Sequence, residues 1–200
     1  MDATEGEGDL DVASQHAIEW ALRLYNHVPP KPVVNGQAWY EGVAGGTPEM
    51  TAQLGYLSFL SDTCGYTYGN SLWNATDADL PAWKALRGAT YMQYLYEFIA
   101  ALDGGRPLQP WHELIMNQAR RAQDRMVVGV SVDGLTYAAF LPQGGTISLD
   151  LTALERHIEV TWYNPLTGQY FGRDTVLGGT VHAFVSPLGS SQSALVLLAH

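Results

Sequence analysis

Apolar residues follow a helical period in several segments of the N-terminal half of the chain. Residues 12–25 carry them on one face, with Asp11 placed to cap the start and Pro29-Pro30 placed to prevent continuation. A second helix is predicted after Thr47 as N-cap, with Pro48 at its first position. Two further helices are predicted, at residues 80–86 and 90–102.

Two short extended segments lie between these predicted helices. The pair Val33-Val34 has the apolar character of a short buried strand, and Asn35-Gly36 after it is typical of a turn. Extended chain resumes at Trp39-Tyr40. Residues 64–70, CGYTYGN, are predicted to form a second strand and turn. The connector at residues 106–115 is expected to pack Trp111 and Leu114 under the last helix.

The period of the apolar residues changes from 3.6 to 2 at about Arg125. Short β-rich runs follow, separated by glycine pairs and other turn residues: RMVVGVSVDG, TYAAFLPQGG, TISLDL, HIEVTWYNPLTGQ, DTVLGGTVHAFV and SALVLLA. Six or seven strands at this spacing favour a small antiparallel sandwich. The predicted fold is therefore α+β, with a disordered leader (residues 1–11), a helical part (12–121) and an antiparallel β-sandwich (122–200).

Composition and charge exclude several classes of function. The chain has 200 residues, of which 46% are hydrophobic, enough for one large domain or two small ones. Its formal net charge is −10, so it repels phosphate backbones and nucleic-acid binding is not expected. It lacks a run of about 18 apolar residues, so no membrane span is expected. Residues 1–11 are acidic and Gly-rich, unlike a signal peptide; the compartment is not predicted.

Metal and nucleophile chemistry find little support in the sequence. Cys64 is the only cysteine, which leaves no internal disulfide and no thiolate metal site; a buried, small hydrophobic role is predicted for it. The six histidines are scattered without ligand spacing, and no Gly-x-Ser-x-Gly motif occurs. No metal or cofactor is therefore expected.

The order of several motifs resembles a known family. The stretches KPVVNGQAWYEG, GYTYGNSLW, ATYMQYLYEFI and PWHEL are similar to the closing part of an apiosidase-like glycoside hydrolase barrel. The stretches YAAFLP, VTWYNPLTG and FVSP resemble the small C-terminal sandwich attached to such barrels, a collagen-binding-type domain. The resemblance implies an eight-stranded (β/α) barrel, which takes roughly 250 residues. Only about 120 residues precede the sandwich here, so a partial barrel is expected, with its two parallel strands corresponding to the seventh and eighth.

The resemblance also places the expected catalytic carboxylates. The family's seventh strand has the pattern Asn/Asp-Gly-Glu-Pro-x-Tyr-Glu; here Gln37 and Ala38 stand at the first glutamate and the proline, and Glu41 keeps the second. Which of these two positions supplies the nucleophile stays open. Tyr66 stands where the eighth-strand motif has histidine. Glycoside hydrolysis needs two carboxyl groups, and a glutamine can neither carry the charge nor transfer the proton. We therefore expect no turnover by the chain alone.

Glu41 has two interpretations. It is either a strand-end carboxylate that hydrogen-bonds neighbouring backbone or is solvated, which is favoured, or a relic of the active site that still touches a ligand. Asp77 and Asp79 are weaker candidates for a second acid, because helix capping explains Asp79. The candidate sugar-binding residues share ring or amide side chains near the strand ends: Trp39, Tyr40, Tyr66, Tyr68, Asn70 and Trp73. Core packing is expected for two or three of them, whereas Trp73 lies in a polar loop and is expected to face a ligand.

Three hypotheses of function follow. The chain is a glycoside hydrolase-like fragment without turnover alone that retains glycan or protein binding, or an active hydrolase completed by oligomerisation or a partner chain. The third hypothesis is an adhesion module built on the sandwich, where Trp162 or Tyr163 points outward as a contact. Parallel strands with open edges also predict a homo-oligomer that buries the barrel remnant.

Overall fold

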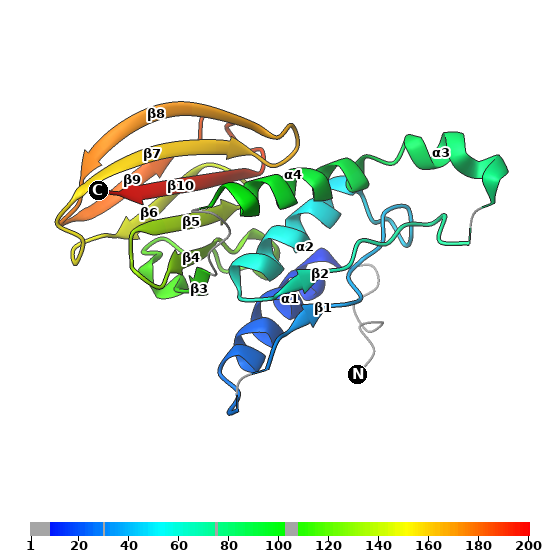
Figure 1. Ribbon diagram of the computed structural model, residues 1–200, viewed down its shortest axis with the longest axis horizontal. Coiled ribbons are helices and arrows are strands. Elements are labelled where there is room, and N and C mark those ends of the chain that lie inside the picture. The colour runs from blue at the N-terminus through cyan, green and yellow to red at the C-terminus, as the bar shows by residue number, and fades with distance from the viewer. Residues whose placement is uncertain (1–8, 30, 75, 103–107) are drawn as a thin grey trace.

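A computed structural model describes residues 9–29, 31–74, 76–102 and 108–200, and it has the predicted α+β fold (Figure 1). Most of the predicted leader, residues 1–8, lies outside the described residues. The order of layers is a small two-stranded sheet, a six-stranded sheet and a layer of helices. Within the described ranges, no helix has the length and apolar character that a membrane crossing needs.

The six-stranded antiparallel sheet forms the centre of the molecule. Along the chain its strands are β3 (Leu108–Pro110), β4 (Val127–Ser131), β5 (Thr136–Leu141), β7 (His157–Asn164), β8 (Gln169–Leu177) and β10 (Ser193–Ala199). In space they follow the order β3-β4-β5-β10-β7-β8. The two-stranded sheet pairs β6 (Thr146–Asp150) with β9 (Val181–Val185) across one face. These elements confirm the predicted small β-sandwich.

Alternation along the strands fills the space between the two sheets. On β7, Ile158, Val160 and Trp162 point to this inner side and are all buried. Ile147 and Leu149 on β6 face them from the smaller sheet and are fully buried. Period-2 patterning thus sets the register, because a slip by one residue would turn these side chains away from the core.

The other face of the six-stranded sheet is covered by helices α2 (Pro48–Leu60) and α4 (Arg87–Ala101) (Figure 1). The Tyr56 ring lies 4.8 Å from the Phe140 ring of β5 and 5.4 Å from the Phe98 ring of α4, measured between centroids. Trp162 and Tyr163 do point to opposite faces of β7, but the expected outward contact is wrong. Tyr163 is buried under the helices, where its hydroxyl donates to the Tyr94 carbonyl at 2.8 Å.

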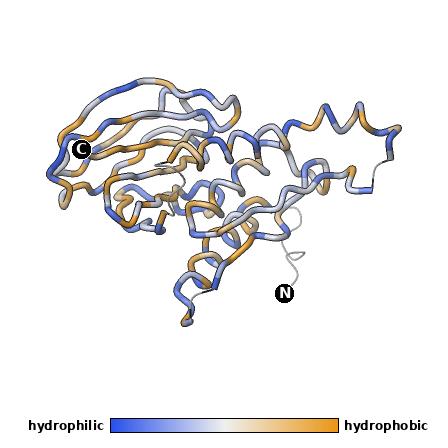
Figure 2. Tube along the Cα trace, viewed as in Figure 1, coloured by the Kyte–Doolittle hydropathy of each residue, from blue (hydrophilic) through white to orange (hydrophobic). Residues whose placement is uncertain are grey.

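Helix α2 begins as predicted. Thr47 Oγ1 accepts from the Met50 N–H, and Pro48 occupies the first turn. The helix is buried on nearly all sides because α1, α4 and the sheet surround it. Figure 2 shows the alternation of hydrophobic and hydrophilic positions that places these helices and strands.

Helix α1 (Leu10–Tyr25) starts two residues before the predicted position. Its N-cap is Asp9, whose side chain accepts from the Asp11 N–H, rather than Asp11 itself. Asp11 instead accepts from the Gln123 N–H at 3.0 Å, which ties the helix to the segment before β4. Two aspartates two positions apart made the cap ambiguous in sequence, and a long-range contact resolved it.

The expected packing of the connector is wrong. Leu108–Pro110 forms the edge strand β3, and Trp111 after it stays 44% exposed. Leu114 packs against the core between the two sheets rather than under a helix. Residues 106 and 107 of the predicted connector lie outside the described residues.

A small parallel pair, β1 (Val34–Asn35) and β2 (Gly65–Tyr66), lies beside α2 and confirms the two predicted parallel strands. Val34 was expected to be buried but is 59% exposed, and Cys64, also expected inside, is exposed. Both predictions failed because only one face of this pair is covered by described residues. Asn35 points to the covered face, where its amide donates to Ser58 Oγ at 2.9 Å.

Candidate functional site

The carboxyl ends of β1 and β2 bring Glu41 and Asn70 side by side. The Glu41 N–H donates to the Gly69 carbonyl at 3.0 Å, and the Ser71 N–H donates to the Glu41 carbonyl at 2.9 Å, so parallel pairing resumes here. The segment between pairings is longer after β1, at residues 36–40, than after β2, at residues 67–69. Active-site residues of parallel barrels come from this end of the strands.

The Glu41 side chain is buried, with 6% of the residue exposed. Its Oε2 atom accepts from the Tyr68 hydroxyl at 2.6 Å and from the Gly88 N–H at 2.9 Å. Gly88 lies in the first turn of α4, where backbone N–H groups lack partners within the helix. Leu86, at the N-cap position, makes no side-chain capping bond. Glu41 therefore caps α4 from a distant segment, and its charge lies at the favourable end of the helix dipole.

A glycine at position 88 allows this approach. A Cβ atom there would overlap Glu41 Oε2 and lie 2.7 Å from Tyr68 Cε2. Any larger residue would push the carboxylate and the helix apart. Position 88 therefore needs glycine because a side chain has no space there. A sequence motif for this contact does not exist, because it joins residues 47 positions apart.

Tyr68 is held in its protonated, donating form. Burial raises the pKa of its hydroxyl well above the ordinary value, and the hydrogen bond to the Glu41 carboxylate raises this pKa further. The carboxylate thus accepts from two fixed donors.

Gln37 lies apart from this arrangement. It is exposed in the loop between β1 and Glu41, whereas Glu41 is buried against α4. The structure therefore gives Gln37 and Glu41 different environments: the acid is buried, and the amide is exposed.

Most of the predicted sugar-binding aromatics have structural contacts. The Trp39 indole N–H donates to the Val43 carbonyl at 2.9 Å, and the Tyr66 hydroxyl donates to the Thr51 carbonyl at 3.2 Å. Both rings pack on the core beneath α2, and the Tyr40 ring lies directly on Gly69. Asn70 closes a turn, because its Oδ1 accepts from the Leu72 N–H at 2.8 Å.

Trp73 differs from these residues because it is 77% exposed. It lies on a segment, residues 72–74 and 76–86, that projects from the body of the molecule and carries helix α3 (Leu80–Lys84) (Figure 1). We name this segment the arm. Helix α3 has no buried residue.

A second tryptophan of the arm, Trp83, was missed by sequence reasoning. It is 46% exposed, and its indole N–H donates to the Leu72 carbonyl at 3.2 Å, beside Trp73. The only signal was a tryptophan within a short predicted helix, which normally indicates packing.

Asp79 of the arm has a local role. Asp79 Oδ2 accepts from the Thr76 N–H at 2.8 Å and from its hydroxyl at 2.9 Å. These bonds lower the pKa of Asp79. The side chain turns back to Thr76 instead of capping α3, so the predicted cap belongs to the preceding turn, Asp77–Asp79.

Comparisons with known proteins agree with this architecture. Residues 110–199 match the family described as "Putative collagen-binding domain of a collagenase", the predicted type of sandwich. The fold is similar to that of a solved glycoside hydrolase, with 17% identity, a TM-score of 0.79 and coverage of 92% of this chain and 46% of the other. A glycoside hydrolase family 5 structure from Bacteroides vulgatus ATCC 8482 gives 16% identity and a TM-score of 0.76, with the same coverage.

The chain spans about half the length of the glycoside hydrolase chains that it matches. No curated protein matches it by sequence.

Proposed function

Because this chain has the fold of the C-terminal part of a glycoside hydrolase-like protein, we propose that it binds glycans and does not break glycosidic bonds by itself. The observation that carries the proposal is the environment of Glu41. Its carboxylate is buried and engaged by Tyr68 and by the N-terminus of α4. A group that holds a helix in place is poorly suited to attack a sugar.

The chemistry of hydrolysis supports the same conclusion. Two carboxyl groups must flank the bond, about 5–5.5 Å apart for retention or about 6.5–9.5 Å for inversion. At the exposed family position the side chain is the amide of Gln37, which cannot act as nucleophile, acid or base. Gln37 can still donate and accept hydrogen bonds to sugar hydroxyls. The site is therefore suited to recognition.

The arm supplies the aromatic surface that glycan binding needs. Trp73 is largely exposed, and the half-exposed Trp83 is held by its bond to the carbonyl of Leu72, the residue before Trp73. Indole rings offer a rigid apolar face on which the C–H face of a sugar stacks, with little loss of side-chain entropy. We propose this pair as the principal glycan contact.

Glycan arrays and titrations with plant polysaccharide oligosaccharides test the proposal. Replacing Trp73 with Ala should weaken binding about five- to ten-fold, since one aromatic contact contributes about 1 kcal/mol. Trp111→Ala is the matched control, because Trp111 is also exposed but lies at the start of the sandwich. Equal effects of the two substitutions, or no binding of any glycan, would refute the proposal.

An active hydrolase completed by a second chain is the alternative. The parallel pair β1 and β2 has one uncovered face and open edges among the described residues, and exposed Val34 lies there. Another chain that covered this surface would add strands and carboxylates. Assays with aryl glycosides on the wild type and Glu41→Gln separate the hypotheses. Turnover that Glu41→Gln abolishes without unfolding the protein would establish the enzyme.

A further inference from the structure

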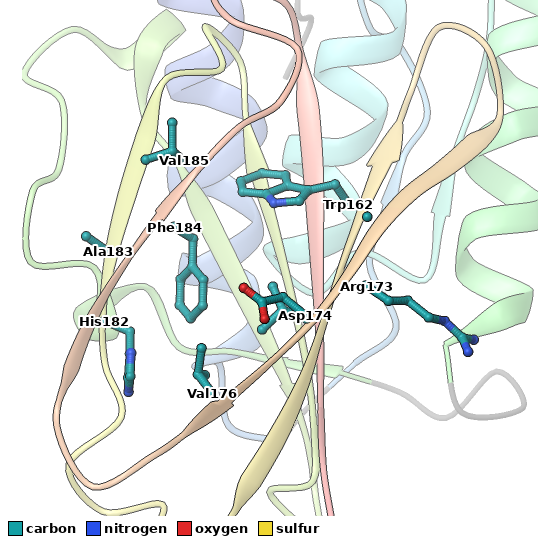
Figure 3. Close-up of a pocket in the computed structure, with 10 residues that line it drawn as sticks. Trp162, Arg173, Asp174, Val176, His182, Ala183, Phe184 and Val185 are labelled. Atoms are coloured by element: carbon teal, nitrogen blue, oxygen red, sulfur yellow. The ribbon is translucent and has the colours of Figure 1, made fainter.

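The open side of the sandwich contains a hollow of about 230 Å³ between β8 and β9 (Figure 3). Its lining combines apolar and polar groups, among them one carboxylate. The residues that matter here are Val160, Trp162, Asp174, Val176, His182 and Phe184. The hollow lies in the sandwich, whereas Glu41 and the arm, which form the candidate glycan site, lie in the helical part. The inference below therefore does not rest on the proposed function.

A β-bulge places the carboxylate of Asp174 in this hollow. Trp162 pairs with Phe171, but Thr161 pairs with Arg173, so Gly172 is an extra residue on β8. Gly172 has φ +59°, a left-handed conformation that favours glycine. The bulge reverses the alternation of β8 and sets Asp174 opposite Val160, on the inner face.

The positive charge of the neighbouring Arg173 lies outside the hollow. The Arg173 side chain extends away from the hollow (Figure 3) and its Nε lies 3.4 Å from Glu159 Oε1 on the outer face. Asp174 Oδ1 accepts from the Thr175 N–H at 2.8 Å. Its Oδ2 has no hydrogen-bond partner within the residues that the structure describes, so this oxygen can receive a ligand.

The hollow at Asp174 fits a cation better than a sugar. Trp162 and Phe184 are only 8% and 7% exposed, so they present no open face for stacking. His182 stacks on Phe184 with 5.9 Å between ring centroids and donates from Nε2 to the Leu177 carbonyl at 2.7 Å. A carboxylate oxygen that is open to a partner attracts ammonium and guanidinium groups through charge-assisted hydrogen bonds.

The strand beside the hollow can hold the chain that carries such a cation. β8 is nine residues long and pairs only with β7 in the described sheet, and β9 pairs only with β6. Unpaired N–H and C=O groups of an edge strand accept an added extended segment. We propose that a lysine- or arginine-containing extended segment of a partner protein adds to β8 and inserts its cationic side chain beside Asp174.

The test uses the full chain and a Thr/Val-rich peptide with one central lysine, titrated by NMR and calorimetry. We expect shifts of amide signals in β8 and β9 and saturable binding. Acetylation of the lysine should weaken binding roughly ten-fold, because it removes the cation and keeps the backbone. The acetylated peptide tests the idea on the wild-type protein, whatever the folding of any variant.

Substitutions then test whether Asp174 is the carboxylate that binds the lysine. Asp174→Asn should weaken binding of the lysine peptide about as much as acetylation does, with no further loss for the acetylated peptide. Glu159→Gln is the matched control, since it removes an equal charge from the outer face of the adjacent strand. The proposal is wrong if acetylation has no effect or if the two variants weaken binding equally. A neutral oligosaccharide that shifts the same signals more strongly would also overturn it.

Discussion

Glu41 uses one carboxylate oxygen to hold two donors that come from different parts of the chain. Tyr68 follows β2, and Gly88 opens α4, so the contact fixes the helix to the end of the parallel pair. Strand-end acids in this fold invite a catalytic interpretation. Here the burial and the two bonds give the acid a structural role at the residue scale.

Removing the acceptor should destabilise the protein. Glu41→Ala leaves the Tyr68 hydroxyl and the Gly88 N–H unsatisfied, so we expect a loss of about 2–4 kcal/mol in the free energy of unfolding, measured with urea. Glu41→Gln keeps one acceptor oxygen and should lose less. Glu113→Gln, at an exposed position, controls for the loss of charge. An unfolding curve of Glu41→Ala that superimposes on the wild type would show that the cap contributes nothing.

Gly88 offers a second test of the same contact. Alanine normally stabilises a helix by up to about 1 kcal/mol relative to glycine. Here its methyl group would overlap Glu41 Oε2, so Gly88→Ala should destabilise the protein by about 1–2 kcal/mol. In a Glu41→Ala background the overlap with the carboxylate is gone, and the same substitution should cost less. Strict additivity of the two changes in thermal melts would argue against the overlap.

Among the elements, the six-stranded sheet stands out because each of its faces belongs to a different core. One face packs on β6 and β9, and the other packs on α2 and α4. The end of α2 is joined to the sheet by His112, whose Nε2 lies 3.2 Å from Ser61 Oγ and whose Nδ1 donates to the Val128 carbonyl at 3.0 Å. The helical part and the sandwich therefore share their interior.

Acid should weaken this junction. Burial lowers the pKa of His112 below its ordinary value of 6.5, and the backbone bond to Val128 only partly offsets this. In the unfolded chain His112 thus takes up a proton near pH 6.5, whereas in the folded chain its side chain is still neutral at that pH. Stability should be fully present above that pH and fall as pH decreases toward the lowered folded pKa.

Chemical denaturation at a series of pH values measures this dependence. His112→Gln should flatten the profile between pH 7 and 5, whereas His27→Gln, at an exposed histidine, should leave it unchanged. If the His112→Gln profile keeps the wild-type slope, then other groups cause the dependence.

The sequence predicted elements well where short-range patterns decide, and poorly where distant contacts decide. The cap at Thr47 and the alternating strands of the sandwich follow from local spacing. Val34, Cys64 and Trp111 are exposed against expectation, because burial depends on which faces the rest of the molecule covers. The cap by Glu41 and the inward turn of Asp174 at the Gly172 bulge leave no periodic signal, so only coordinates reveal them.

For the whole molecule, the parallel pair is a surface with an uncovered face among the described residues. Val34 of β1 and Trp20 and Leu24 of α1 are exposed apolar residues of the helical part. Such surfaces favour association with another chain. The net charge of −10 opposes association through long-range repulsion, which salt screens.

We therefore expect reversible self-association at micromolar concentration that strengthens with salt, measured by sedimentation velocity. Val34→Glu should shift the protein toward monomer, because it places a charge on the uncovered face. Val132→Glu, at an exposed turn of the sandwich, is the matched control. A compact monomer at all concentrations and salt levels would contradict the expectation.

Each face of the six-stranded sheet packs in a different core, and this limits how the fold can have been inherited. Residues 122–200, moved alone into another protein, would bring Phe140, Tyr163 and Val196 to the surface without the helices that cover them. Such a transfer would yield an aggregating product unless the recipient supplied a matching apolar layer. Gene rearrangement should therefore keep this sandwich together with the helices before it, as one heritable block.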